Sequence, residues 1–320
     1  MNETIKNTAK QFGFKPEIIN KENIKEHMGY VVVGMGGSYL AAGLLKMWKP
    51  ELDMVGHQDY GLPELPTVEL QKRLIILSSY SGNTEEVIDA YKKAGEMGLN
   101  RIVISIGGQL LEMAKKDQTA YIQMPDWGIQ PRAAWALSLM SFVKAVGEET
   151  MLLELGKLQN DLRPDELETA GKELAQRLSC RVPVIYTAGK NKILAYIWKI
   201  NLNETGKIPA FYNVFPELNH NEMNGFDVAE PTRQLSEKFY FIMLSDPEDQ
   251  PKIRKRMEIT AKLYRDRKLP VEIINLEGSN SFQRIVNSIV LAGFTAYYTA
   301  TNYGLESEQV PMVEEFKKLV

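Results

Sequence analysis

Cysteine and histidine are scarce in this sequence, which has one Cys, at position 180, and three His among 320 residues. A single cysteine cannot form an intramolecular disulfide, and one Cys with three His offers few ligands for a structural metal site. No stretch approaches the run of roughly 18 apolar residues that crosses a bilayer, and the first residues, MNETIKNTAKQFGF, are polar. These absences predict a soluble protein of a reducing, cytoplasmic compartment.

An excess of either charge is also missing. The 38 basic and 41 acidic residues leave a formal net charge of -3, so the sequence has no electrostatic signature of nucleic-acid or membrane binding. The 44% hydrophobic and 25% charged content is close to the globular average. A chain of 320 residues is long enough for two domains, each with an apolar core.

What is present is a repeated order of apolar strand, small-residue loop and helix. It occurs in YVVVGMGGSYLAAGLLKMW, in RLIILSSYSGNTEEVIDAYKKAGEMG and in RIVISIGGQLLEMAKK, and a long helix is expected over 132–155. The second half repeats the order, with strands at VPVIYTAG, KFYFIMLS and PVEIINL. The pattern predicts two α/β domains, each doubly wound (αβα) around a mostly parallel sheet. We expect them at 1–154 and 169–320, joined by the polar segment 155–168, with a last helix over 312–319.

Two loops of the first half could hold an anion. SSYSGNTEE, at 78–86, places hydroxyl groups between a strand and a helix start, where free N–H groups and the helix dipole favour a phosphate. Ordinary N-capping by Ser81 or Thr84 explains the same residues about equally well. GMGGS, at 34–38, resembles a dinucleotide-binding turn only loosely, because Tyr39 stands where GxGxxG requires glycine. We expect its backbone to approach a small ligand, with Ser38 adding a hydroxyl.

Three further residues could carry chemistry. Arg132, in IQPRAAW, lies at an expected helix start, where the dipole disfavours a cation and a carboxylate or oxyanion partner is indicated. Glu204, in NLNETGK, ends an expected helix, where the dipole could raise the pKa of a carboxylate toward that of a useful base. His220, in the loop PELNHNEMNG, can titrate near neutral pH. Taken singly, each has a plain surface role as its alternative.

Together, SYSGNT after a strand, QPR before a helix, NE at a helix end and PELNHNE in the next loop resemble the bifunctional phosphoglucose/phosphomannose isomerase family of sugar isomerase (SIS) domain proteins. The order matches across nearly the whole chain. The resemblance implies two SIS domains and a homodimer. It also implies a substrate-phosphate site formed by Gly37, Ser38, Ser79, Ser81 and Thr84.

The resemblance further implies catalytic roles for four residues. Glu204 would move the proton between C1 and C2, Arg132 would steady the enediolate, and His220, contributed by the partner subunit, would assist ring opening. Lys317 would lie at the ring oxygen, with Lys318 in its place if the register shifts by one. The chain departs from the family at Tyr39, where GGSG is usual, and lacks the usual Asp-Pro before its last helix.

The expected activity is therefore interconversion of glucose 6-phosphate, and of mannose 6-phosphate, with fructose 6-phosphate, as in glycolysis or gluconeogenesis. No cofactor and no metal are expected. One alternative is a non-catalytic sugar-phosphate-binding SIS regulator, although the roughly 29 residues before the first strand are too few, and not basic enough, for a DNA-binding module. Another is the isomerase half of glucosamine 6-phosphate synthase, which would need an N-terminal nucleophilic Cys, whereas the one Cys stands at 180.

Overall fold

The computed structural model describes residues 1–319, which divide into two compact units. The first consists of residues 7–161, and the second combines residues 1–6 with the chain from 162 onward. Within the described residues, no helix has both the length and the apolar character required to cross a membrane.

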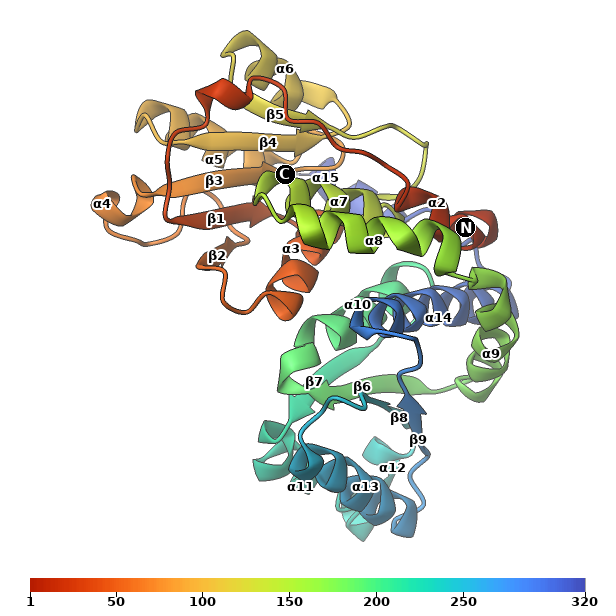
Figure 1. Cartoon of the computed structure of the whole chain (residues 1–320). Coiled ribbons are helices and arrows are strands. Elements are labelled where there is room, and N and C mark those ends of the chain that lie inside the picture. The colour runs from red at the N-terminus through yellow and green to blue at the C-terminus, as the bar shows by residue number, and fades with distance from the viewer. Residues whose placement is uncertain (320) are drawn as a thin grey trace. The chain divides into compact units, whose positions relative to one another are not determined.

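The sheet of the first unit has five parallel strands in the order β2-β1-β3-β4-β5 (Figure 1). The central strands are almost fully buried and rich in Val, Ile and Leu, as expected where helices cover both faces of a parallel sheet. The strands are β1 (Gly29–Gly34), β2 (Met54–His57), β3 (Arg73–Ser78), β4 (Arg101–Ser105) and β5 (Ala120–Gln123).

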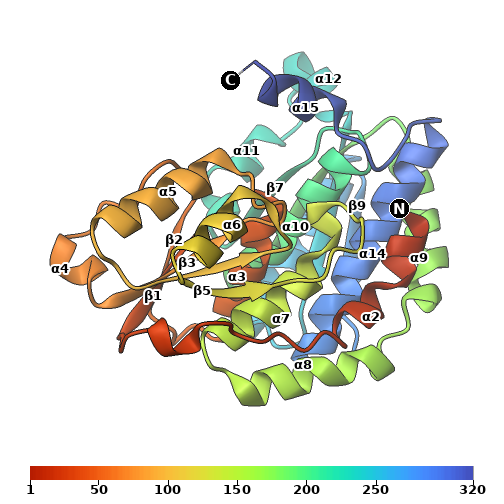
Figure 2. The same cartoon turned by 90° about the horizontal axis from the view of Figure 1, so that it is seen from above.

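Helices cover both faces of this sheet. One face carries α5 (Glu85–Glu96) and α6 (Gly108–Lys116), and the other carries α3 (Gly37–Trp48) and α7 (Trp135–Ala145), with α8 (Glu149–Asp161) packed behind α7 (Figure 2). The core between the sheet and α5 includes Val31, Ile75, Val87 and Tyr91. Short helices complete the unit: α2 (Thr8–Gln11), η1 (Lys21–Asn23), α4 (Thr67–Leu70) and η2 (Pro131–Ala133).

The sheet of the second unit has four parallel strands in the order β7-β6-β8-β9. They are β6 (Val182–Ala188), β7 (Phe211–Phe215), β8 (Phe239–Ser245) and β9 (Val271–Asn275). The long helices α9 (Pro164–Arg177), α10 (Lys192–Glu204) and α14 (Ser281–Asn302) cover one face, and α13 (Pro251–Asp266) covers the other (Figure 1). The predicted α/β fold with two mostly parallel sheets is confirmed.

Shorter elements connect these strands and helices. They are α1 (Asn2–Lys6), η3 (Gly189–Asn191), η4 (Glu217–His220), α11 (Glu222–Gly225), η5 (Glu230–Thr232), α12 (Arg233–Ser236) and α15 (Pro311–Lys317). The helix α1 packs against α9 and α14, which is why the first six residues belong to the second unit.

Some boundaries differ from the expected ones. The helix expected over 132–155 is two helices, α7 and α8, because Gly147 adopts a φ of +78° between them. The polar segment expected to connect the domains, 155–168, is mostly helical: α8 continues to Asp161, and α9 begins at Pro164. These two helices are amphipathic, and their polar faces account for the composition that resembled a linker.

Candidate active site

The loops after β1 and β3 meet at the point where the sheet of the first unit changes winding direction. The crossover helix α3 leads from β1 to β2, whereas α5 leads from β3 to β4 on the other side. In open α/β sheets, the crevice at such a switch point is where ligands bind. The two loops predicted to hold an anion, 34–38 and 78–86, therefore lie side by side at this crevice.

Hydroxyl groups join the two loops. The Ser38 hydroxyl oxygen accepts the N–H of Tyr80 at 3.0 Å, and the Ser78 hydroxyl donates to the Ser38 carbonyl at 3.2 Å. The hydroxyl oxygens of Ser79 and Thr84 lie 2.8 Å apart, and Ser79 also accepts the N–H of Gly82 at 3.1 Å. Ser38 thus joins the two loops through Ser78 and Tyr80, and Ser79 and Thr84 form a hydroxyl pair within the second loop.

The geometry of Thr84 bears on the capping alternative. Thr84 occupies the N-cap position of α5, yet among the described residues its hydroxyl accepts no N–H of that helix. Ser81 is exposed and accepts only the N–H of Asn83, at 3.2 Å, among the partners described. The first N–H groups of a helix have no partner within it, so the start of α5 can donate to an anion placed beside Ser79 and Thr84.

The neighbouring loop after β4 supports this cluster and was not predicted to take part. Gln109 donates its N–H to the Asn83 side-chain oxygen at 3.0 Å, and Leu110 donates to the Gly82 carbonyl at 2.9 Å. Gly82 has a φ of +72°, and a Cβ added there would lie 1.8 Å from the Gly107 carbonyl oxygen. The glycines of the two loops therefore permit a close crossing, and the pair GG at 107–108 was the available sequence signal.

Arg132 lies beside the first loop. A Cβ added at Gly37 would be 2.9 Å from the Arg132 backbone nitrogen, so glycine at 37 lets η2 approach the start of α3. The Arg132 side chain is buried, with 4% exposed. Arg132 belongs to η2 rather than to the first turn of a long helix, since α7 begins only at Trp135. The structure therefore brings Arg132 together with Gly37 and Ser38.

A buried glutamine that sequence reasoning missed holds this turn. The Gln11 side chain, in α2, donates to the Ala133 carbonyl at 2.8 Å and accepts the N–H of Leu137 at 3.3 Å. Gln11 is 1% exposed, and a buried amide with both functions satisfied fixes the backbone that it joins. No local pattern links a helix near the N-terminus to the QPR turn, so the contact is visible only in the fold.

Tyr39, the departure from the family pattern, does not enter the first loop. Its hydroxyl oxygen lies over Gly56 of β2, only 1.7 Å from where a Cβ at that position would be. The ring is half-buried, and this burial raises the pKa of the Tyr39 phenol. Glycine at 56 therefore accommodates the side chain at 39 on the face of the sheet that α3 covers.

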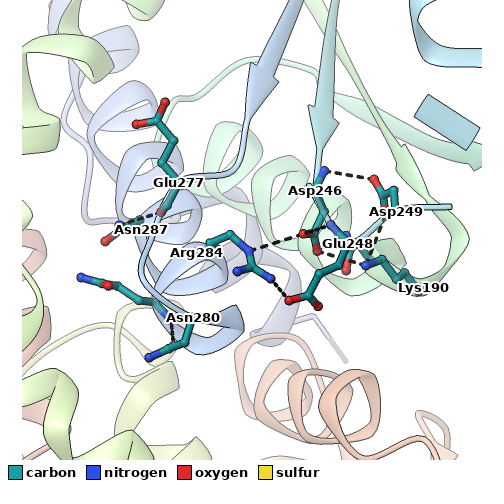
Figure 3. A network of polar contacts seen from close by, with 10 residues as sticks. Lys190, Asp246, Glu248, Asp249, Glu277, Asn280, Arg284 and Asn287 are labelled. Atoms are coloured by element: carbon teal, nitrogen blue, oxygen red, sulfur yellow. Dashed lines mark hydrogen bonds and ion pairs between the residues drawn. The ribbon is translucent and has the colours of Figure 1, made fainter. Parts of the chain in front are cut away.

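The second unit has an equivalent crevice with opposite chemistry. The crossover α10 leads from β6 to β7, and α13 leads from β8 to β9, so the winding changes between β6 and β8. Buried Asp246 and Asp249 lie there, with Lys190 at 3.2 and 3.4 Å from their carboxylates (Figure 3). Arg284 of α14 joins them, 3.4 Å from Asp246 and paired with Glu248.

The two buried carboxyl groups of this network titrate differently. Burial would raise the pKa of Asp246, but hydrogen bonds from the Glu248 N–H and Asn191, together with Lys190, hold it below its ordinary value. Burial dominates at Asp249 and raises its pKa. A network of carboxylates and paired cations has no place for a phosphate, which distinguishes this crevice from the hydroxyl-lined one.

Glu204 and the loop of His220 both belong to the second unit, but they lie at opposite ends of its sheet. Glu204 is the last residue of α10, which runs antiparallel to β6 and β7 and therefore ends at the amino edge of the sheet. His220 follows β7, at the carboxyl edge, and is exposed. Within one chain, the structure does not bring these two expected catalytic residues together.

The exposed loop of His220 is held in place by its neighbours. Glu222 accepts hydrogen bonds from the Tyr186 hydroxyl, at 2.5 Å, and from the Asn213 amide, which fasten the loop to β6 and β7. Asn219 donates to the Thr260 hydroxyl of α13 at 2.9 Å. Glu222 and Asn219 therefore have structural roles, and their contacts fix the backbone on both sides of His220.

The C-terminal segment passes beside the turn that follows Glu204. The Lys207 ammonium donates to the Glu204 carbonyl at 2.6 Å and to the Gln309 carbonyl, two residues before α15. Lys317 lies on α15, is exposed, and pairs with Glu314 at 3.0 Å. Lys318 follows the helix and is also exposed. Lys207 thus joins the end of α10 to the segment that leads into α15, and His220 is not part of this arrangement.

Comparison with known proteins identifies the family of this chain. Residues 167–320 match the bacterial phospho-glucose isomerase C-terminal SIS domain. The chain is 35% identical over 305 residues to a bifunctional phosphoglucose/phosphomannose isomerase of Caldicellulosiruptor bescii, covering 90% of this chain and 88% of that protein. It is 30% identical to the protein of the same name from Aquifex aeolicus, over 95% of this chain and 94% of the relative.

A solved structure agrees in fold. Tagatose-6-phosphate ketose/aldose isomerase from Escherichia coli superimposes with a TM-score of 0.67 at 15% identity, over 96% of this chain and 95% of that one. With this likeness in fold, and with relatives at 30 to 35% identity over nearly their whole length, the resemblance seen in the sequence motifs is confirmed. The chain is an isomerase and belongs to the bifunctional phosphoglucose/phosphomannose isomerase family.

Proposed function

We propose that this isomerase interconverts glucose 6-phosphate, and also mannose 6-phosphate, with fructose 6-phosphate through an enediolate. The observation that carries the proposal is the set of hydroxyls of Ser38, Ser79 and Thr84 on two adjoining loops at the switch point of the first unit. It supports binding of the substrate phosphate there, with Gly37 and Ser81 completing the site. The start of α5 would supply N–H groups and the positive end of its dipole.

The chemistry requires a base and an oxyanion partner. In the proposal, the Glu204 carboxylate takes the proton from C2 of the open-chain aldose and returns it to C1, which is worth roughly 10² to 10⁴-fold in rate. The buried Arg132 guanidinium stabilises the enediolate oxygens, and a preorganised cation of this kind contributes a comparable share. Because C2 is planar in the enediolate, both C2 epimers lead to the same ketose.

Ring opening must occur at atoms adjacent to those that exchange the proton, so its acid/base group has to lie within a few ångströms of the Glu204 carboxylate. His220 of the same chain lies at the other edge of the sheet. This separation supports donation of His220 by the partner subunit of a homodimer. Lys317 would act at the ring oxygen from the same chain as Glu204, since Lys207 links their segments.

The alternative of a non-catalytic regulator would use the same hydroxyl cluster only to sense a sugar phosphate. One assay distinguishes the isomerase from the regulator: conversion of glucose 6-phosphate and of mannose 6-phosphate by the purified protein. We expect turnover of both substrates. Tight binding of fructose 6-phosphate without turnover would favour the regulator.

The base is tested in the same assay with Glu204→Gln, which keeps the size of the side chain and removes its basicity. We expect kcat to fall by at least about 10²-fold on both substrates. Glu173→Gln, at an exposed position of α9, is the matched control and should retain full activity. Wild-type turnover by Glu204→Gln would rule out Glu204 as the base.

A further inference from the structure

The last helix, α15, exposes an apolar stripe. Met312 and Phe316 are 81% and 61% exposed, and their spacing of four residues places them on one face of the helix. Leu319, two residues after the end of the helix, is 79% exposed. Large apolar side chains gathered on one face of a short amphipathic helix are typical of a surface that another element covers.

A groove of matching character lies beside the loop of His220. It has a volume of about 460 Å³ between α13 and the segment formed by η4 and α11. Its apolar lining comes from Met223, Ile259 and Leu263, and three cations, Lys252, Lys255 and Arg256, also line it. We call this the α13 groove.

The α13 groove has a fixed wall on the side of His220. Asn219, the residue before His220, lines the groove and is bound to Thr260 of α13 at 2.9 Å. Ile259, on the opposite wall, is 48% exposed. The groove is therefore a preformed surface that moves together with the His220 loop.

The proposed active site brings the stripe and the groove together. If His220 of one copy reaches Glu204 of another, Asn219 and the α13 groove arrive with it. At Glu204, they meet the segment that leads into α15, because Lys207 joins the carbonyls of Glu204 and Gln309. This step rests on the proposed function and its donation of His220 between subunits.

We propose that the α15 stripe of one copy docks into the α13 groove of a second copy. Phe316 and Met312 would cover Ile259, Leu263 and Met223. Glu314 is paired with Lys317 on the same helix, so Glu315, which is exposed, is the carboxylate that complements the cations of the groove. One helix of seven residues cannot supply the roughly 800 Å² per partner of a standard interface. Docking would therefore complete a dimer rather than create one, and it would fix Lys317 beside the partner's His220 loop.

Cross-linking between single cysteines tests this contact directly. The chain has one cysteine, Cys180, which is exposed, so Cys180→Ser gives a cysteine-free parent. Phe316→Cys and Ile259→Cys are each introduced into that parent, mixed, allowed to exchange subunits and oxidised. Since a disulfide requires Cα atoms within about 7 Å, we expect a covalent mixed dimer on a non-reducing gel. Val68→Cys, at a 59% exposed position of α4, replaces Phe316→Cys as the control and should give little product.

Two outcomes contradict the docking. One is the absence of a mixed disulfide although the parent is an active dimer. The other is an intramolecular disulfide in the double variant carrying both cysteines, formed at the same rate at every protein concentration, which would mean that α15 covers the groove of its own chain. A parent that lacks isomerase activity on both substrates would instead contradict the proposed function, so the two failures are distinguishable.

Discussion

The separation of Glu204 from His220 leads to a prediction about mixtures of inactive variants. The helix α10 rises about 18 Å from Lys192, near the carboxyl edge of the sheet, to Glu204 at the amino edge. His220 follows β7 back at the carboxyl edge. Proton transfer requires contacts of about 2.6–3.2 Å, so a gap of this size prevents both residues of one chain from acting on the same hexose.

Mixing Glu204→Gln with His220→Ala should therefore restore activity. Random exchange of subunits makes half of the dimers mixed, and each mixed dimer has one site with both an intact Glu204 and an intact partner His220. A two-fold symmetric dimer then recovers about a quarter of the wild-type activity. The measurement is turnover of glucose 6-phosphate after exchange in mild denaturant and dilution, with each variant treated alone as the control.

The activity recovered by the mixture distinguishes a site shared between subunits from a site within one chain. If both residues acted within one chain, every site in the mixture would lack one of them, and the activity would stay at the sum of the two variants. Such a result, obtained with exchange verified by a mixed dimer of tagged chains, would refute the argument from the sheet edges. An active monomer in solution would refute it as well.

Three further predictions concern two close contacts of glycines and one ionised carboxylate of α9. Gly82→Ala should raise KM steeply and lower the free energy of unfolding, measured by thermal unfolding, by at least about 2 kcal/mol. The reasons are the φ of +72° at this position and the collision of an added Cβ with the Gly107 carbonyl oxygen. Gly56→Ala should lower the free energy of unfolding by about 1–2 kcal/mol, because the new methyl group would collide with the Tyr39 hydroxyl. The double variant with Tyr39→Phe should recover part of this stability. Glu168 lies on α9, and hydrogen bonds from Tyr298, Asn2 and Lys6 lower its pKa from 4.5 to about 2. Its stabilisation is therefore complete above pH 4.5 and is lost as pH falls toward 2, so urea unfolding should show Glu168→Gln destabilised at pH 7 and closest to wild type at pH 2.

The fold was predictable because its signals are local. Buried strands such as β3 and β8 are continuous apolar runs, and the loops after them are rich in small polar residues. The strand β2 was missed because its four residues, MVGH, are partly exposed at the edge of the sheet and contain a glycine. The two units divide between residues 161 and 162, inside the polar segment 155–168, but that segment is mostly helical, because the exposed faces of α8 and α9 have the composition of a linker.

The candidate site was predictable only in part, for a similar reason. Ser79, Ser81 and Thr84 stand within six residues of one another, so sequence alone indicates their common loop. The approach of Arg132 to Gly37 and the hydrogen bond from Gln11 to Ala133 join residues 95 and 122 positions apart, and both depend on the tertiary fold. The position of His220 relative to Glu204 is a property of the sheet topology, which composition and spacing do not contain.

The two switch points explain why one hydroxyl-lined crevice per chain is suited to the phosphate, although both units have the same winding. At the first, the side chains of the cluster are neutral hydroxyls and the backbone supplies donors to a dianion, while Glu85 and Glu86 follow Thr84 in the first turn of α5. At the second, a dianion would have to displace Asp246 and Asp249, which are buried and paired with Lys190. Exposing that lysine to the ligand would leave two buried carboxylates without their cation, which costs several kcal/mol. This contrast is the reason why we propose the phosphate site at the crevice of the first unit and not at the acidic crevice of the second.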